Sequence, residues 1–81
     1  MSIESLLHRL QPMFRQAFGD DTLKLTETTR MEDIPSWDSI SHMALITATE
    51  QEFDIRFSLA ELVSVAEVGD LIALIQAKKG G

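Results

Sequence analysis

The sequence predicts an all-α fold, a small four-helix bundle with three main helices, one short third helix and a long loop between the first two helices. Apolar residues recur at helical spacing in separate segments, and no segment of useful length alternates apolar and polar residues as a strand does. The chain has no internal repeat and no low-complexity tract, and its 81 residues suit one small domain. We therefore expect residues 1–81 to form a single domain.

The first helix is predicted over residues 3–18. The apolar residues at helical spacing are Ile3, Leu6, Leu7, Leu10, Met13, Phe14, Ala17 and Phe18. Ser2 is a suitable N-cap and Gly19 a suitable stop. Pro12 lies inside the segment, and a proline there removes one hydrogen bond and crowds the preceding turn. We expect either a kink at Pro12 or a helix that restarts with Pro12 in its first turn.

Residues 19–38 show no sustained period and are predicted to form a long loop. Such loops are uncommon in compact domains unless they are anchored or functional. The residues that could anchor this loop in the core are Leu23, Leu25, Met31, Ile34 and Trp37. Trp37 could instead contact a partner, but a lone tryptophan in a small domain more often packs inside.

The second helix is predicted over residues 39–53, with Asp38 as its N-cap, and it carries two apolar faces. One face supplies core residues, namely Leu45, Ile46, Thr49 and Phe53. The opposite face collects Ile40, Met43, Ala44, Thr47 and Gln51. Because a small bundle has one core, this second strip should face solvent or a partner. Ile40 and Met43 could be isolated surface residues, but their spacing beside acidic residues is typical of a docking patch.

Two further helices complete the fold. A short helix is predicted over residues 58–62, starting at Ser58. The last helix is predicted to begin at Ser64, whose spacing to Glu67 matches a capping box, and to end before Gly80 and Gly81.

Composition excludes several classes of function. Seven basic residues against thirteen acidic ones disfavour nucleic acid as a ligand and favour partners with basic surfaces. The longest apolar run, Leu71–Ile75, is far shorter than the roughly 20 residues of a membrane span, so a cytoplasmic protein without such a span is expected. The chain lacks cysteine, and His8 has no partner at ligand spacing, so no metal site is predicted. No nucleophile and base stand at a useful spacing, so an enzyme is not expected.

Ser39 is the residue whose position points most directly to chemistry. A side chain in the first turn of a helix lies near unpaired backbone N–H groups, where a phosphate is favoured by hydrogen bonding and by the helix dipole. Asp38 and Ser39 could equally be ordinary capping residues, which begin many helices, and spacing alone favours that interpretation.

The tripeptide Asp38-Ser39-Ile40, at the start of a second helix after a long loop, resembles the attachment motif of acyl carrier proteins. The resemblance covers nearly the whole chain, including the segments 50–55 and 68–72. It implies that Ser39 receives 4′-phosphopantetheine from coenzyme A, and that the thiol of this arm carries an acyl group as a thioester. It also implies that Asp38 helps to engage the phosphopantetheinyl transferase.

The chain departs from two patterns within this family. Carriers of fatty-acid synthesis usually have acidic residues soon after the serine, where this chain has Ser41 and Ala44. Peptidyl carriers usually have a Gly-Gly pair before the serine, where this chain has residues 35–37, Pro-Ser-Trp. The sequence is more similar to dedicated carriers of specialised pathways, and the choice among fatty-acid, polyketide and other biosynthesis stays open.

We therefore predict a monomeric carrier that presents an acyl group to acyl-loading and acyl-accepting enzymes with basic docking surfaces. The predicted partner contacts are Ile40, Met43, Ala44, Thr47, Trp37, Glu50 and Glu61. His42, one turn after Ser39, is predicted to be a surface histidine, with contact to the phosphodiester as the alternative. The alternative function is a small acidic helical adaptor that binds partners noncovalently and leaves Ser39 unmodified.

Overall fold

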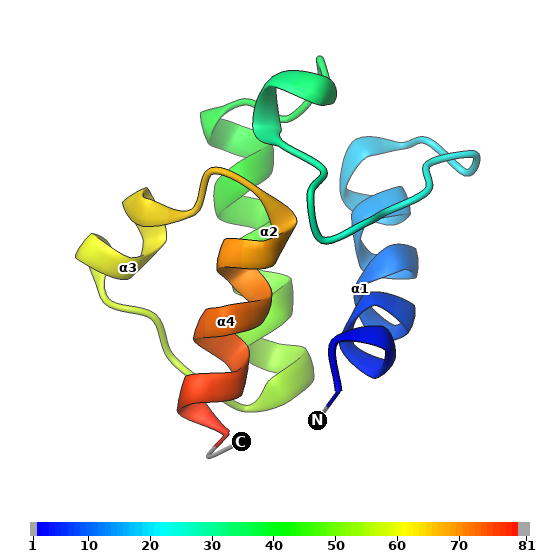
Figure 1. Ribbon diagram of the computed structural model, residues 1–81. Coiled ribbons are helices and arrows are strands. Elements are labelled where there is room, and N and C mark those ends of the chain that lie inside the picture. The colour runs from blue at the N-terminus through cyan, green and yellow to red at the C-terminus, as the bar shows by residue number, and fades with distance from the viewer. Residues whose placement is uncertain (1, 80–81) are drawn as a thin grey trace.

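The computed structural model describes residues 2–79, and within them it contains four α-helices, one 3-10 helix and no strand beyond an isolated bridge between Arg30 and Glu67 (Figure 1). The elements in order are α1 (Ile3–Phe18), η1 (Met31–Asp33), α2 (Ser39–Phe53), α3 (Leu59–Ser64) and α4 (Val68–Lys78). The predicted all-α fold is confirmed. None of the helices in this part of the chain is both long and apolar enough to cross a bilayer.

Helix α1 has the predicted bounds. The Ser2 side chain accepts a hydrogen bond from the Ser5 backbone N–H, and Gly19 ends the helix in the left-handed conformation with φ of 63°. The helix continues through Pro12, so the predicted restart at that residue is wrong. The reason is packing: Leu10 and Phe14 are fully buried on either side of an exposed Pro12, and tertiary contacts of this kind outweigh one missing hydrogen bond.

The core is shared by α1, α2 and α4. Its helical members are Leu6, Leu10, Phe14, Leu45, Ile46, Phe53, Val68, Leu71, Ile72 and Ile75. The core face predicted for the second helix is confirmed, since Leu45, Ile46, Thr49 and Phe53 are all buried. Helix α3 contributes no fully buried residue, but its Leu62 packs partly buried against the core and its Glu61 pairs with Lys78 of α4.

The long loop between α1 and α2 is anchored as predicted. Leu25, Ile34 and Trp37 are buried, and Leu23 and Met31 pack partly buried against the core. These contacts bring the end of the loop, and therefore the start of α2, to a fixed place on the bundle.

The same loop is also hydrogen-bonded to the segment that leads into α4. The Met31 N–H donates to the Ala66 carbonyl at 3.0 Å, and the Val68 N–H donates to the Thr29 carbonyl at 2.8 Å. The Gly69 N–H donates to the Glu27 carbonyl at 2.7 Å. We call residues 27–31 and 66–69 the loop zipper.

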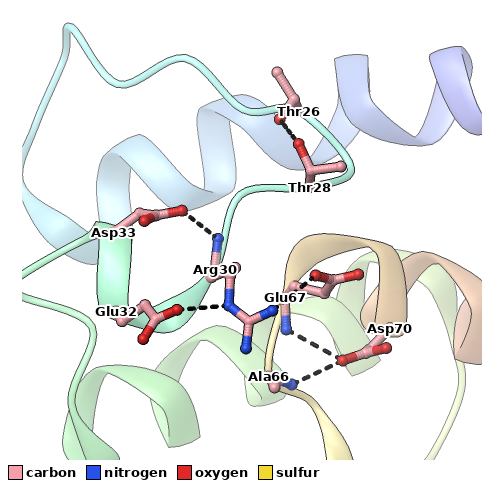
Figure 2. Close-up of polar contacts among 8 residues, drawn as sticks. All are labelled: Thr26, Thr28, Arg30, Glu32, Asp33, Ala66, Glu67 and Asp70. Carbon is pink, nitrogen blue, oxygen red and sulfur yellow. Dashed lines mark hydrogen bonds and ion pairs between the residues drawn. The ribbon is translucent and has the colours of Figure 1, made fainter.

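Arg30 joins the two sides of the loop zipper (Figure 2). Its backbone N–H donates to the Asp33 carboxylate, while the Arg30 guanidinium pairs with Glu32 at 2.7 Å and with Glu67 at 3.7 Å. The side chains of this arginine and of Glu32 are largely exposed, so these ion pairs stabilise the zipper less than its backbone bonds do.

The last two helices differ from the prediction at their boundaries. Helix α3 covers Leu59–Ser64, and α4 begins at Val68 after Glu67 rather than at Ser64. The predicted capping box of Ser64 and Glu67 is therefore wrong. The Ser64 hydroxyl instead donates to the Glu61 carbonyl at 2.7 Å and closes α3, while the Asp70 carboxylate accepts from the Glu67 N–H. The predicted stop at residues 80 and 81 lies outside the described part of the chain.

The first turn of α2, which begins at Ser39, lies at the opposite end of the bundle from the start of α1 and the end of α4 (Figure 1). Helix α2 starts at the top of the view, beside η1, and runs downward. Helix α1 begins and α4 ends at the bottom.

Candidate functional site

Ser39 is the first residue of α2 and is exposed to solvent. The N-cap is Asp38, whose carboxylate accepts hydrogen bonds from the Ile40 N–H at 3.1 Å and from the Ser41 N–H at 2.9 Å. The Ser41 hydroxyl donates to the Ser36 carbonyl at 2.6 Å. Within residues 2–79 the Ser39 hydroxyl has no hydrogen-bond partner of its own. The predicted division of roles, with Asp38 as cap, leaves this hydroxyl available to another molecule.

Asp38 places a negative charge at the beginning of α2. Hydrogen bonds from the Ser41 backbone N–H and hydroxyl, joined by the Ile40 N–H, hold the pKa of the Asp38 carboxyl below its ordinary value of 3.8. The carboxylate is therefore ionised at neutral pH, and it complements the positive end of the helix dipole beside Ser39.

The second apolar strip of α2 faces solvent, as predicted. Ile40 is 81% exposed and Met43 is 49% exposed, and Ala44 and Thr47 are exposed on the same helix. Two large apolar residues of α3, Leu59 and Val63, are also exposed, at 77% and 70%. The strip is thus available as a surface, and its use by partners stays a prediction.

A pocket lies between α2, α3 and the loop zipper. Its volume is about 270 Å³, and its lining residues are Met31, Ser39, His42, Met43, Leu62, Val63 and Val65. The pocket is mostly apolar, and Ser39 is part of its wall. Sequence reasoning did not predict this pocket, because it depends on where α3 is placed against α2.

His42 is not the surface residue that the sequence suggested. It is 7% exposed, and its Nδ1 accepts a hydrogen bond from the Trp37 indole N–H at 2.9 Å. Its Nε2 lies 3.0 Å from the Leu62 carbonyl oxygen of α3. The prediction failed because one partner, Leu62, is 20 residues away in sequence. The available signal was the single Trp37 in the loop just before α2, followed by a histidine in the first turns of that helix.

Three predicted partner contacts have structural partners within the protein. Trp37 is 4% exposed and packs against the Phe14 ring, which confirms its role as an anchor and leaves little surface for a partner. Glu50 accepts from the Phe57 N–H at 2.8 Å. Glu61 accepts from the Ser58 N–H and pairs with Lys78 at 2.8 Å. The hydrogen bond from Lys78 is the main reason why the pKa of Glu61 lies below its ordinary value. Both glutamates thus hold α3 and its preceding loop in place.

Among residues 2–79, no three His, Asp or Glu side chains come together in a group that could hold a metal ion. The groups that stand out at the start of α2 are the Ser39 hydroxyl, the Asp38 carboxylate and the exposed apolar residues beside them.

Comparison with known proteins gives a consistent answer, although no family model matches the sequence. The acyl carrier protein of Thermotoga maritima is 27% identical, over 98% of each chain. That of an Exiguobacterium species is 28% identical, over 96% of this chain and 99% of the relative.

The solution NMR structure of a holo acyl carrier protein from Geobacter metallireducens is more similar in sequence. It is 46% identical, with a TM-score of 0.84, and the match covers 91% of this chain and 85% of that one. This identity, shared along most of both chains and accompanied by the same arrangement of helices, shows that the protein belongs to the acyl carrier protein family.

Proposed function

We propose that the protein carries an acyl group as a thioester on a 4′-phosphopantetheine arm attached to Ser39, and that it presents this group to partner enzymes. As an acyl carrier protein it is a carrier and not an enzyme. The observation that carries the assignment to Ser39 is its exposed hydroxyl at the start of α2, with Asp38 rather than Ser39 acting as the cap.

Three other serines are less suited to attachment. The hydroxyl of Ser41 donates to the Ser36 carbonyl, and that of Ser64 donates to the Glu61 carbonyl. The hydroxyl of Ser58 caps α3. Modification of any of these groups would break a hydrogen bond that shapes a helix end, whereas modification of Ser39 breaks none.

The surroundings of Ser39 fit the proposed arm. A helix start favours a phosphate, because its backbone N–H groups and its dipole attract negative charge. The arm supplies a terminal thiol for thioester formation, which the cysteine-free chain lacks. Asp38 keeps α2 capped, and the apolar pocket beside Ser39 offers a surface on which the carried group can rest.

The surface around Ser39 supports the proposed partners, which are a phosphopantetheinyl transferase and acyl-handling enzymes with basic docking surfaces. Ile40 and Met43 provide apolar contact area, and the net charge of −6 favours association with basic proteins.

Intact mass spectrometry tests the proposal. The protein is incubated with coenzyme A and a broad-specificity phosphopantetheinyl transferase, and the mass of one phosphopantetheine should be added to wild type but not to Ser39→Ala. Ser36→Ala is the matched control, because Ser36 is also exposed and keeps its carbonyl bond to Ser41. A wild-type protein that gains no mass, or a Ser39→Ala variant that gains the same mass, would refute the assignment and favour a noncovalent adaptor.

A further inference from the structure

The pocket beside Ser39 has a polar group in its otherwise apolar wall, and that group is His42. The indole of Trp37 can only donate, so the Nδ1 atom of His42 must accept and carries no proton. A neutral imidazole then has its proton on Nε2, which donates to the Leu62 carbonyl. We call this arrangement of Trp37, His42 and the Leu62 carbonyl the His42 latch.

The His42 latch separates the pocket from the aromatic part of the core. His42 lines the pocket, whereas Trp37 does not. The Trp37 ring stacks beside the imidazole at an interplanar angle of 28°, and it also contacts the rings of Phe14 and Phe18 on α1. A group that extends inward from the pocket toward α1 therefore meets His42 first and Trp37 second.

Opening the latch is unfavourable for an apolar guest. It would leave the Trp37 N–H and the Leu62 carbonyl without partners, and an alkyl chain cannot replace either hydrogen bond. The Leu62 carbonyl lies near the end of α3, where carbonyls lack donors within the helix. Among the described residues, no buried side-chain nitrogen or oxygen is left without a partner. The latch thus behaves as a fixed wall.

The space in front of this wall is small. Its volume of about 270 Å³ is just below the lower end of the roughly 300–1,000 Å³ found for small-molecule sites. We propose that His42 is a positioning residue that sets the depth of the pocket, so that the protein shelters a short acyl group and leaves a longer chain outside the latch. This inference rests on the proposed attachment at Ser39.

The test compares the NMR signals of the protein when it carries acyl groups of increasing length. Wild type is loaded from butyryl-, octanoyl- and dodecanoyl-coenzyme A with the transferase, and each form is checked by intact mass. Trp37 is the only tryptophan, so its indole N–H gives one assignable NMR signal at the latch. The methyl signals of Val63 and Val65 report on the pocket.

In wild type we expect the Val63 and Val65 methyl signals to move when butyryl is loaded. The Trp37 signal should keep its position in all three acyl forms. In His42→Leu, which removes both nitrogens, the Trp37 signal should move between the butyryl and dodecanoyl forms. His8→Leu is the matched control, because His8 is exposed on α1, and it should behave as wild type.

A Trp37 signal that moves with chain length in wild type overturns the depth limit, and so do Val63 and Val65 signals that never move. This wild-type series decides the question even if His42→Leu fails to fold. An unchanged Trp37 signal in folded dodecanoyl His42→Leu overturns the role of His42. Wild type that takes up no acyl-phosphopantetheine refutes the proposed function itself, and the mass measurement separates that outcome from the others.

Discussion

Gly69→Ala should test how the loop zipper holds the segment that leads to Ser39. Gly69 lies in the first turn of α4, and a Cβ added there would lie 2.8 Å from the Glu27 carbonyl oxygen. The position of a Cβ is fixed by its backbone and the Glu27 oxygen belongs to the backbone, so no side-chain rotation can relieve the contact. The loop must move away from α4, which lengthens the Gly69 to Glu27 hydrogen bond and its neighbour between Val68 and Thr29.

The expected loss can be estimated from two opposing effects. Inserting a methyl group into such a contact costs about 1–3 kcal/mol in folding stability. Alanine is a better helix former than glycine by about 1 kcal/mol, which offsets part of this cost. We expect the free energy of unfolding to fall by up to roughly 2 kcal/mol, and at about 4–8 °C per kcal/mol for a domain of this size, Tm should fall by up to roughly 16 °C.

Thermal and urea unfolding followed by circular dichroism measure this change. Ala73→Gly is the matched control, because Ala73 is exposed on the same helix and reports the alanine to glycine difference without the contact. A Gly69→Ala protein that unfolds at a higher temperature than wild type would refute the reasoning, since the gain in helix propensity would then outweigh the contact with Glu27.

Three further predictions concern the Ser39 region. Asp38→Ala should lower the free energy of unfolding at neutral pH. Because the pKa of Asp38 is lower in the folded protein than its ordinary value of 3.8, the wild-type protein should have its full advantage in stability above pH 3.8. This advantage should vanish as the pH falls through the lowered pKa. Urea titrations at several pH values check this, and a pH-independent difference would contradict it. Met43→Glu should slow loading by the transferase while the helical content stays unchanged. Gln51→Glu adds the same charge near the far end of α2 and should load at the wild-type rate. If both variants load at the wild-type rate, the apolar strip has no role in binding the transferase. Raising the ionic strength should slow association with a basic partner in stopped-flow measurements, and rates that do not depend on salt would remove the electrostatic contribution.

The helices that the sequence predicted correctly are those whose boundaries depend on neighbouring residues. Ser2 and Gly19 bound α1, and Asp38 caps α2, through contacts made within a few positions of each helix end. Asp38 and Ser39 could therefore be placed at a helix start from sequence pattern and family resemblance alone.

The features that were missed depend on residues distant in sequence. The first N–H groups of α4, those of Val68 and Gly69, donate to the carbonyls of Thr29 and Glu27, which lie far away in the sequence. The local pair of Glu67 and Asp70 also caps this start, but Ser64 and Glu67 matched the same spacing one turn earlier. His42 is buried because α3 brings the Leu62 carbonyl to it. The position of α3, a helix without a buried residue of its own, cannot be read from apolar periodicity, so the pocket could not be predicted.

The opposite placement of Ser39 and of the described chain ends decides how the protein can be held in an experiment (Figure 1). A linker that enters beside the start of α1 or the end of α4 approaches the bundle from the side away from the first turn of α2. Tethering through either end to a sensor surface or a bead should leave the Ser39 face pointing into solution. Partner enzymes could then be measured on immobilised protein without the support blocking the site where they act.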